Sequence, residues 1–330
     1  MVNEDLKVSV VICAYTQDRW ADLQRAIRSI QDQSEQPSEI ILVIDHNPAL
    51  FALAQSSFPE VKVIENKESR GLSGARNSGV ALSTGEVVAF IDEDAAADNA
   101  WVENLLSSYQ YPQVIGVGGE VRPEWIVAPP GWFPEEFHWV VGCSYKGLPE
   151  VKAPVRNPIG CNMSFRRQAL ISAGGFRNGV GRIGTLPVGC EETELTIRLK
   201  QQKPDSIYLY QPRAVVMHKV PEWRLKWRYF IQRCYSEGIS KALVTHYVGS
   251  TDGLSSERRY VIYTLPRGIF SGLLEAITRR RLSGFKRAAA IIVGLMITTT
   301  GYLAGMFKRL RSKYLSAWVR QKATSHARES

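Results

Sequence analysis

The chain has 330 residues, of which 45% are hydrophobic, and this is enough for a real core in one large domain or two smaller ones. Its five cysteines are scattered and lack CxxC spacing, which argues against a disulfide framework and a zinc site and favours a reducing compartment. The N-terminal segment lacks the basic-then-apolar build of a signal peptide.

The formal net charge of +9 is unevenly distributed. Residues 258–330 hold 15 Lys or Arg and two Glu, whereas the preceding residues hold 26 basic and 30 acidic side chains. A uniformly basic chain would indicate nucleic acid as the partner. A basic tail beside apolar segments favours membrane lipids with an anionic surface instead.

Buried strands and amphipathic helices alternate through the first 120 residues. Apolar runs predict strands over residues 7–15, 39–45, 61–66 and 86–92. Apolar residues at helical spacing predict helices over residues 21–33, 49–58, 73–83 and 100–110. Such alternation predicts an α/β fold with a mostly parallel sheet, whose ligands bind outside the carboxyl ends of the strands.

Carboxylates follow two of these strands. Asp45 ends the second, and Asp92, Glu93 and Asp94 end the fourth. Because the carboxyl ends of parallel strands meet at one edge, a cation such as Mg²⁺ or Mn²⁺ would offset the repulsion of these carboxylates. The alternative is that the strands simply reach water there, where Asp is common in turns.

The segments VSVVICAY, EIILVID and NKESRGLSGARNSGVALSTGEVVAFIDED, in this order, resemble the nucleotide-binding half of glycosyltransferase family 2, which has the GT-A fold. The resemblance covers roughly residues 7–220 and implies a nucleotide-sugar donor. It implies that Asp45 contacts the base, Asp92 lies near the ribose and Asp94 binds the metal. The donor-binding residues that it implies are Ala14, Tyr15, Asp45, Arg76, Asn77, Asp92 and Glu93. After Asp45 the chain departs from the family pattern with HNP at residues 46–48.

No glycine-rich phosphate loop follows the first strand. The segment CAYTQDRW contains no GxGxxG, and no GK[ST] occurs in the chain. This argues against a dinucleotide-binding Rossmann domain and a P-loop, so a metal and side chains must handle the phosphates.

A second acidic pair lies in CEETEL at residues 190–195. The resemblance implies that Glu192 is the catalytic base, with Glu191 beside it contacting the acceptor or the helix start. An inverting transfer to a hydroxyl needs such a base. The alternative is that both glutamates only favour the first turn of a helix.

Three further residues complete the predicted site. The resemblance implies that His218 reaches the metal or the pyrophosphate, although a lone His is more often structural. Asn162 and Arg224 are weaker candidates for the acceptor side. Arg224 could meet the leaving diphosphate or a phosphorylated acceptor, and a basic residue near a membrane surface is the alternative.

The C-terminal region contains two apolar segments. Residues 288–307 carry no charge and are long enough to cross a hydrocarbon core of about 30 Å. Residues 260–277 are interrupted by polar residues and are better interpreted as an interfacial helix. The tail can span the membrane, form a hairpin or lie in its plane, and a buried helix is the alternative. Residues 233–244 resemble the glucosyl-dolichyl-phosphate glucuronosyltransferase-like subgroup of the family.

These patterns predict a GT-A catalytic domain over residues 1–225 and a helical, basic, membrane-associated region over residues 226–330. Residues 1–120 would form its nucleotide-binding half and residues 121–225 its acceptor half. The predicted function is an inverting, metal-dependent glycosyltransferase with a nucleotide-sugar donor, first of all a UDP-sugar. It would act at the cytosolic membrane face on a hydroxyl of a glycan or lipid-linked saccharide. The alternatives are a polyprenyl-phosphate sugar synthase, a nucleotidyltransferase and an inactive membrane scaffold.

Overall fold

The structure is a computed structural model that describes residues 6–182, 189–253, 255–278 and 282–326. A central nine-stranded sheet has the order β3-β2-β1-β4-β8-β6-β9-β5, and β7 also pairs with β9. The strands are β1 (Val8–Ala14), β2 (Glu39–Ile44), β3 (Lys62–Glu65), β4 (Val87–Asp92), β5 (Ala95–Ala97), β6 (Val114–Trp125), β7 (Ala153–Val155), β8 (Asn162–Arg166) and β9 (Ile207–Val220).

The parallel part of the sheet consists of the four strands that the sequence predicts. β3, β2, β1 and β4 are mutually parallel. β8 runs antiparallel to β4 and β6, while β6 and β9 are parallel to each other. The sheet is therefore mixed as a whole. The acidic residues lie at the carboxyl ends of two of its parallel strands, β2 and β4.

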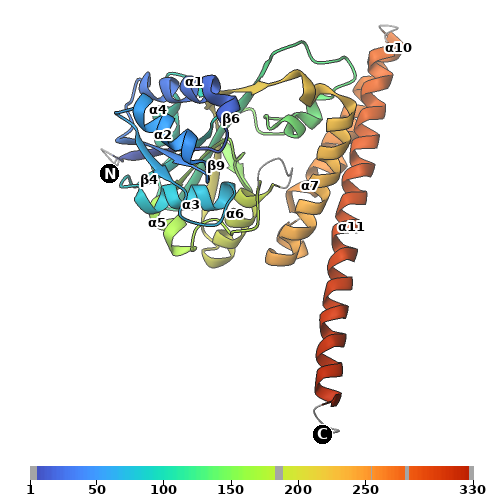
Figure 1. Ribbon diagram of the computed structural model, residues 1–330. Coiled ribbons are helices and arrows are strands. Elements are labelled where there is room, and N and C mark those ends of the chain that lie inside the picture. The colour runs from blue at the N-terminus through green and yellow to red at the C-terminus, as the bar shows by residue number, and fades with distance from the viewer. Residues whose placement is uncertain (1–5, 183–188, 254, 279–281, 327–330) are drawn as a thin grey trace.

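Helices cover both faces of this sheet (Figure 1). The α-helices of the α/β part are α1 (Trp20–Gln31), α2 (Pro48–Ser57), α3 (Leu72–Leu82), α4 (Trp101–Leu106), α5 (Arg167–Ser172) and α6 (Glu191–Gln202). Short 3₁₀ segments are η1 (Gln17–Arg19), η2 (Glu135–Val141) and η3 (Glu222–Leu225).

Burial on both faces explains the continuous apolar run of β1. Val10 and Ile12 belong to the core that contains Leu23 of α1, whereas Val11 belongs to the core under α3. α3 approaches β1 closely at Gly79, where an added Cβ would lie 2.6 Å from Val11 Cγ1. A glycine usually weakens a helix, but here Gly79 is required by helix–sheet packing.

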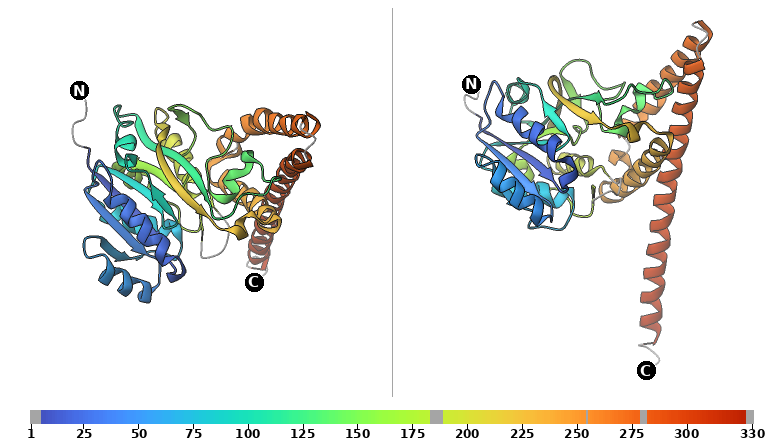
Figure 2. Two further views of the ribbon diagram at one scale, coloured as in Figure 1. Left: turned by 90° about the horizontal axis from the view of Figure 1, so that it is seen from above. Right: turned by 45° about the horizontal axis from the view of Figure 1, so that its top comes forward.

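The C-terminal region is helical, as predicted. Its elements are α7 (Trp227–Val248), α8 (Ser250–Gly253), α9 (Ser255–Arg259), the π-helix η4 (Tyr260–Thr264), α10 (Leu265–Thr278) and α11 (Leu282–His326). α7 lies between the α/β part and α11, and α11 extends well beyond the α/β part at its C-terminal end (Figures 1 and 2). One segment of α11, Leu282–Phe307, is long and apolar enough to cross a membrane, with a mean hydropathy of 1.7.

Candidate active site

Asp45, at the carboxyl end of β2, organises the loop that leads into α3. Its Oδ1 accepts a hydrogen bond from Asn66 Nδ2 at 2.7 Å, and its Oδ2 accepts one from the Gly71 amide at 2.9 Å. The unusual HNP turn also serves this geometry: His46 has φ 51° and its Nδ1 lies 2.9 Å from Asp45 Oδ1, while Asn47 caps α2. Both carboxylate oxygens of Asp45 already accept hydrogen bonds within the protein. The predicted contact of Asp45 with the nucleobase therefore stays a prediction.

Arg76 brings the two acidic motifs together. Its Nη1 donates to Glu191 Oε1 at 2.7 Å, and its Nη2 lies 3.4 Å from Asp92 Oδ1. Nη2 also donates to the Gly160 carbonyl at 2.9 Å. The Arg76 side chain is 2% exposed, whereas that of Asp92 is 34% exposed. One buried guanidinium therefore joins the end of β4 to the start of α6 and leaves Asp92 accessible.

Asp94 is surrounded by basic side chains. Its Oδ1 is 3.3 Å from His218 Nε2, and its Oδ2 is 3.3 Å from both Arg224 Nη2 and Arg19 Nη1. Pairing of β5 with β9 sets Ala95 opposite His218, which explains why the neighbouring Asp94 meets this histidine. Burial by itself would raise the pKa of Asp94, but His218 and the two arginines hold it well below its usual range.

Asp94 and His218 have donor types that a divalent cation accepts, and metal binding by this pair stays a prediction. Arg224 Nη1 also lies 3.5 Å from His218 Nε2. Neighbouring ligands of an octahedral ion with bonds of about 2.1 Å lie about 3 Å apart, close to the 3.3 Å between Asp94 Oδ1 and His218 Nε2. The other ring nitrogen of His218 is 3.7 Å from Cys143 Sγ, so Nε2 is the one turned toward Asp94. Within the described residues no group of three or more His, Cys, Asp or Glu converges, so further ligands would be phosphate oxygens and water.

Glu93 and Tyr15 face the start of α1. Glu93 Oε1 accepts a hydrogen bond from Arg19 Nη1 at 3.0 Å, and the Arg19 guanidinium lies 5.7 Å from the centre of the Tyr15 ring. Burial raises the pKa of Glu93 to about 8, and Arg19 offsets only part of that effect. Glu93 is 3% exposed, so in this arrangement it supports Arg19 from beneath.

Glu192 lies in the first turn of α6, and its carboxylate has different contacts from that of Glu191. Glu191 is committed to Arg76, while the contact described for the Glu192 carboxylate comes from the Thr193 hydroxyl, 3.2 Å from Oε1. Burial, followed by the charge of Glu191, raises the pKa of Glu192 to about 7. A carboxylate with a pKa near neutrality is suited to take a proton from a hydroxyl.

Other predicted residues have structural contacts. Asn77 donates to the Phe176 carbonyl at 2.9 Å and accepts from its amide at 2.8 Å. Asn162 is fully buried: it accepts from Trp101 Nε1 and donates to the carbonyls of Glu120 and Ala214.

These contacts bear on the predicted roles. The amide of Asn162 is fully used, so its predicted acceptor contact finds no support in this placement. Arg224 lies beside Asp94, with Nη2 3.3 Å from Oδ2, and its acceptor role stays a prediction. Ala14 is buried at the end of β1, where it pairs with Ile44 of β2.

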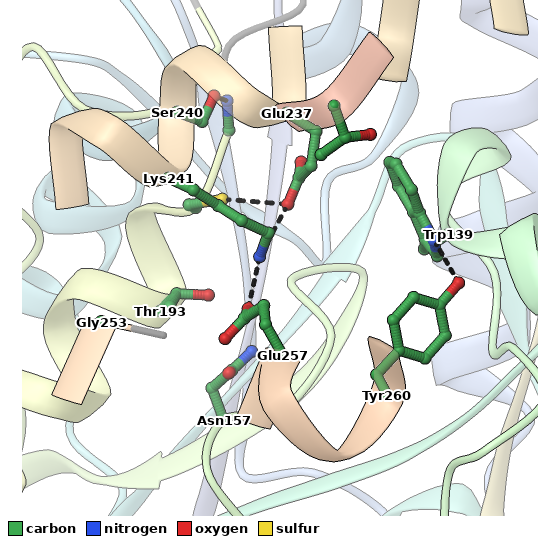
Figure 3. A network of polar contacts seen from close by, with 12 residues as sticks. Trp139, Asn157, Thr193, Glu237, Ser240, Lys241, Gly253, Glu257 and Tyr260 are labelled. Carbon is green, nitrogen blue, oxygen red and sulfur yellow. Dashed lines mark hydrogen bonds and ion pairs between the residues drawn. The ribbon is translucent and has the colours of Figure 1, made fainter. Parts of the chain in front are cut away.

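A polar network on α7 supports the start of α6, and the sequence patterns did not reveal it (Figure 3). Lys241 Nζ lies 3.2 Å from Glu237 Oε1 and 2.5 Å from Glu257 Oε1. Glu237 accepts a hydrogen bond from Cys190 Sγ at 3.4 Å, and Ser240 Oγ accepts one from the Gly189 amide at 3.1 Å. α7 therefore holds the two residues that precede Glu191.

A cavity of about 1170 Å³ lies elsewhere, among α4, β6, β9 and the segment at residues 144–152. None of the predicted site residues line it. The acidic residues lie instead at the carboxyl ends of β2 and β4, the edge at which ligands of such sheets bind, and Asp92 is the most exposed of them.

Known proteins are similar to this chain in sequence and in fold. Residues 9–173 match the family model described as glycosyl transferase family 2. The glucosyl-dolichyl phosphate glucuronosyltransferase of Haloferax volcanii is 36% identical over 72% of this chain and 77% of that protein. The succinoglycan biosynthesis protein ExoM of Rhizobium meliloti is 25% identical over 72% of this chain and 75% of its own.

Two solved structures share the fold at low sequence identity. GalNAc-T7, solved with UDP, GalNAc and Mn²⁺, has a TM-score of 0.53 at 16% identity over 78% of this chain and 54% of that chain. The mannosyltransferase PcManGT from Pyrobaculum calidifontis, solved with GDP-Man and Mn²⁺, has a TM-score of 0.53 at 17% identity over 88% of this chain and 86% of that chain. The GT-A fold is thereby confirmed, and the chain belongs to glycosyl transferase family 2.

Proposed function

We propose that this glycosyltransferase is inverting and metal-dependent, and that it transfers a sugar from a UDP-sugar to a hydroxyl of a lipid-linked saccharide at the cytosolic membrane face. The observation that carries the proposal is the Arg76 bridge, which sets Glu191, and with it Glu192, against the carboxylate at the end of β4. The name of the Haloferax relative supports a glycosylated polyprenyl phosphate as the acceptor and a glucuronosyl group as the transferred sugar.

The transfer is a single displacement at the anomeric carbon. The acceptor oxygen bonds to that carbon, the bond to the donor diphosphate breaks, and Glu192 takes the acceptor proton. Asp94 and His218 would hold Mg²⁺ or Mn²⁺, which supplies positive charge to the departing diphosphate. Arg224 and Arg19 add fixed positive charge at the same edge.

The test uses the full-length protein with lipid vesicles, UDP-glucuronic acid and a glucosylated polyprenyl phosphate. We expect UDP release coupled to transfer, and loss of transfer in Glu192→Gln with donor affinity retained. Glu35→Gln, a change at an exposed glutamate, serves as the matched control.

Other outcomes assign the alternatives. An active Glu192→Gln with a bare polyprenyl phosphate would indicate a sugar synthase, because an acceptor phosphate needs no base. Release of pyrophosphate would indicate nucleotidyl transfer, and no turnover with any donor would indicate a scaffold.

A further inference from the structure

The apolar segment of α11 has one face buried along its length. Gly284, Ala288, Ile291, Gly294 and Gly301 are buried, at the spacing of one helix face. The opposite face exposes a row of apolar side chains, namely Phe285, Ile292, Met296, Leu303 and Phe307. The segment therefore has a protein side and an open side.

The buried face is fixed to the rest of the molecule at several points. Near its start, Arg287 Nη2 lies 3.1 Å from Oε1 of Glu136, a residue of η2 that is 1% exposed. Further along, an added Cβ at Gly294 would lie 2.5 Å from the Phe137 ring, and Gly301 packs directly against the backbone of Tyr235 in α7. The same helix face thus contacts η2 and then α7.

This packing argues against a membrane crossing by the segment. A crossing helix needs about 20 residues in hydrocarbon. Here α7 accompanies α11 through the second half of the segment, with Gly238 and Ala242 in contact with it. Their neighbours Glu237 and Lys241 are charged and belong to the network that supports α6. A crossing would carry these charges into hydrocarbon or leave Glu136 buried without Arg287.

We infer that α10 and α11 lie in the plane of an anionic phospholipid bilayer, with their open faces in its interface, and that the chain does not cross it. α10 adds the exposed side chains of Phe270, Leu273, Leu274 and Ile277. Arg267 and Lys286 are exposed on the same hairpin, in a region with 15 basic and two acidic residues, which matches anionic headgroups. The inference fixes a topology that the proposed function leaves open, and it does not depend on the transfer reaction.

The first test is topological. Full-length protein with one epitope tag at each end is expressed, and sealed membrane vesicles of known orientation are treated with protease. We expect both tags to be cleaved from the same side, together with loss of the catalytic part. Tags protected on opposite sides would overturn the inference.

The second test measures binding of purified protein to vesicles with and without anionic phospholipid. Ile292→Glu should weaken binding to anionic vesicles at least about tenfold, because it places a charge in the apolar contact. Ile171→Glu on α5 is the matched control, since Ile171 and Ile292 are 44% and 45% exposed. An equal loss of vesicle binding in both variants would overturn the inference. A dimer that forms without lipid and is dissociated by Ile292→Glu would also overturn it.

Discussion

The Arg76 guanidinium lies 2.7 Å from Glu191 and 3.4 Å from Asp92, so one buried cation connects two acidic motifs that are distant in the sequence. Glu191 is itself 5% exposed, and removal of its partner would leave a buried charge uncompensated. The site is thus held together by the same contact that joins two parts of the fold.

Arg76→Leu should therefore lower the free energy of unfolding by about 3–5 kcal/mol. The double variant Arg76→Leu/Glu191→Leu should recover much of this loss, because the buried Glu191 charge is gone and Asp92, which also loses its Arg76 partner, is 34% exposed to water, while transfer activity stays lost. Chemical denaturation of the wild type, both single variants and the double variant forms the cycle. Additive changes in the free energy of unfolding would contradict the described pair.

Asp94→Asn should abolish transfer and weaken binding of Mn²⁺ in the presence of UDP, since it removes a charged ligand from the pair with His218. EDTA should inactivate the wild type reversibly. Calorimetry of Mn²⁺ and UDP binding gives a readout that does not depend on turnover. Asp205→Asn, at an exposed position, should behave as the wild type; full activity of the wild type in chelator would refute the metal role.

The activity should depend on the protonation of Glu192. Its pKa is raised to about 7, and only the deprotonated form accepts a proton, so kcat/KM should rise with pH and reach half its maximum near pH 7. Glu191→Gln removes a neighbouring negative charge that raises this pKa, so the rising limb should move to lower pH. A profile that is unchanged in Glu191→Gln would show that another group controls it.

Ser240→Ala should reduce kcat about tenfold with little change in the KM for the donor, because the hydroxyl that holds the Gly189 amide positions the start of α6. Ser240 is fully buried. Thr245→Ala is the control, since that hydroxyl bonds to Ala242 within α7. Equal effects of both changes on kcat would mean that α7 is merely loosened.

Glu257 should contribute stability that acid removes. Arg156 and Lys241 outweigh the effect of burial and lower its pKa from 4.5 to about 2. The folded state therefore binds fewer protons than the unfolded state between these pH values, and its stability falls as the pH drops through this window. A pKa lowered to about 2 corresponds to a contribution on the order of 3 kcal/mol above pH 4.5. Glu257→Gln should show a shallower acid limb in thermal unfolding, whereas an identical limb would exclude this role.

Local patterns carried much of the prediction. The apolar run of β1 and the helical spacing in α1 predicted those elements to within a residue or two, because both are buried against helices or sheet along their length. The carboxylates at the ends of β2 and β4 were predicted to share an edge of the sheet. The Arg76 contacts add that Asp92 lies beside the start of α6.

Contacts between distant segments could not be predicted from one sequence. Nothing in the sequence around Arg76 indicates that its partners are Glu191 and the Gly160 carbonyl. Likewise, Asn162 resembles a polar site residue until the fold places its amide between β6, β9 and the Trp101 indole. The support of α6 by α7 depends on tertiary packing alone.

α7 contacts α6 on one side and α11 on the other, and this arrangement has a consequence for the size of the substrate. A helix with its side chains is about 10 Å across. On the proposed bilayer contact, α7 and the part of α11 that stands above the interface both lie between the lipid and α6, so the reacting hydroxyl must stand more than one helix diameter above the lipid surface. The headgroup of the lipid-linked acceptor must therefore be long enough to span that gap.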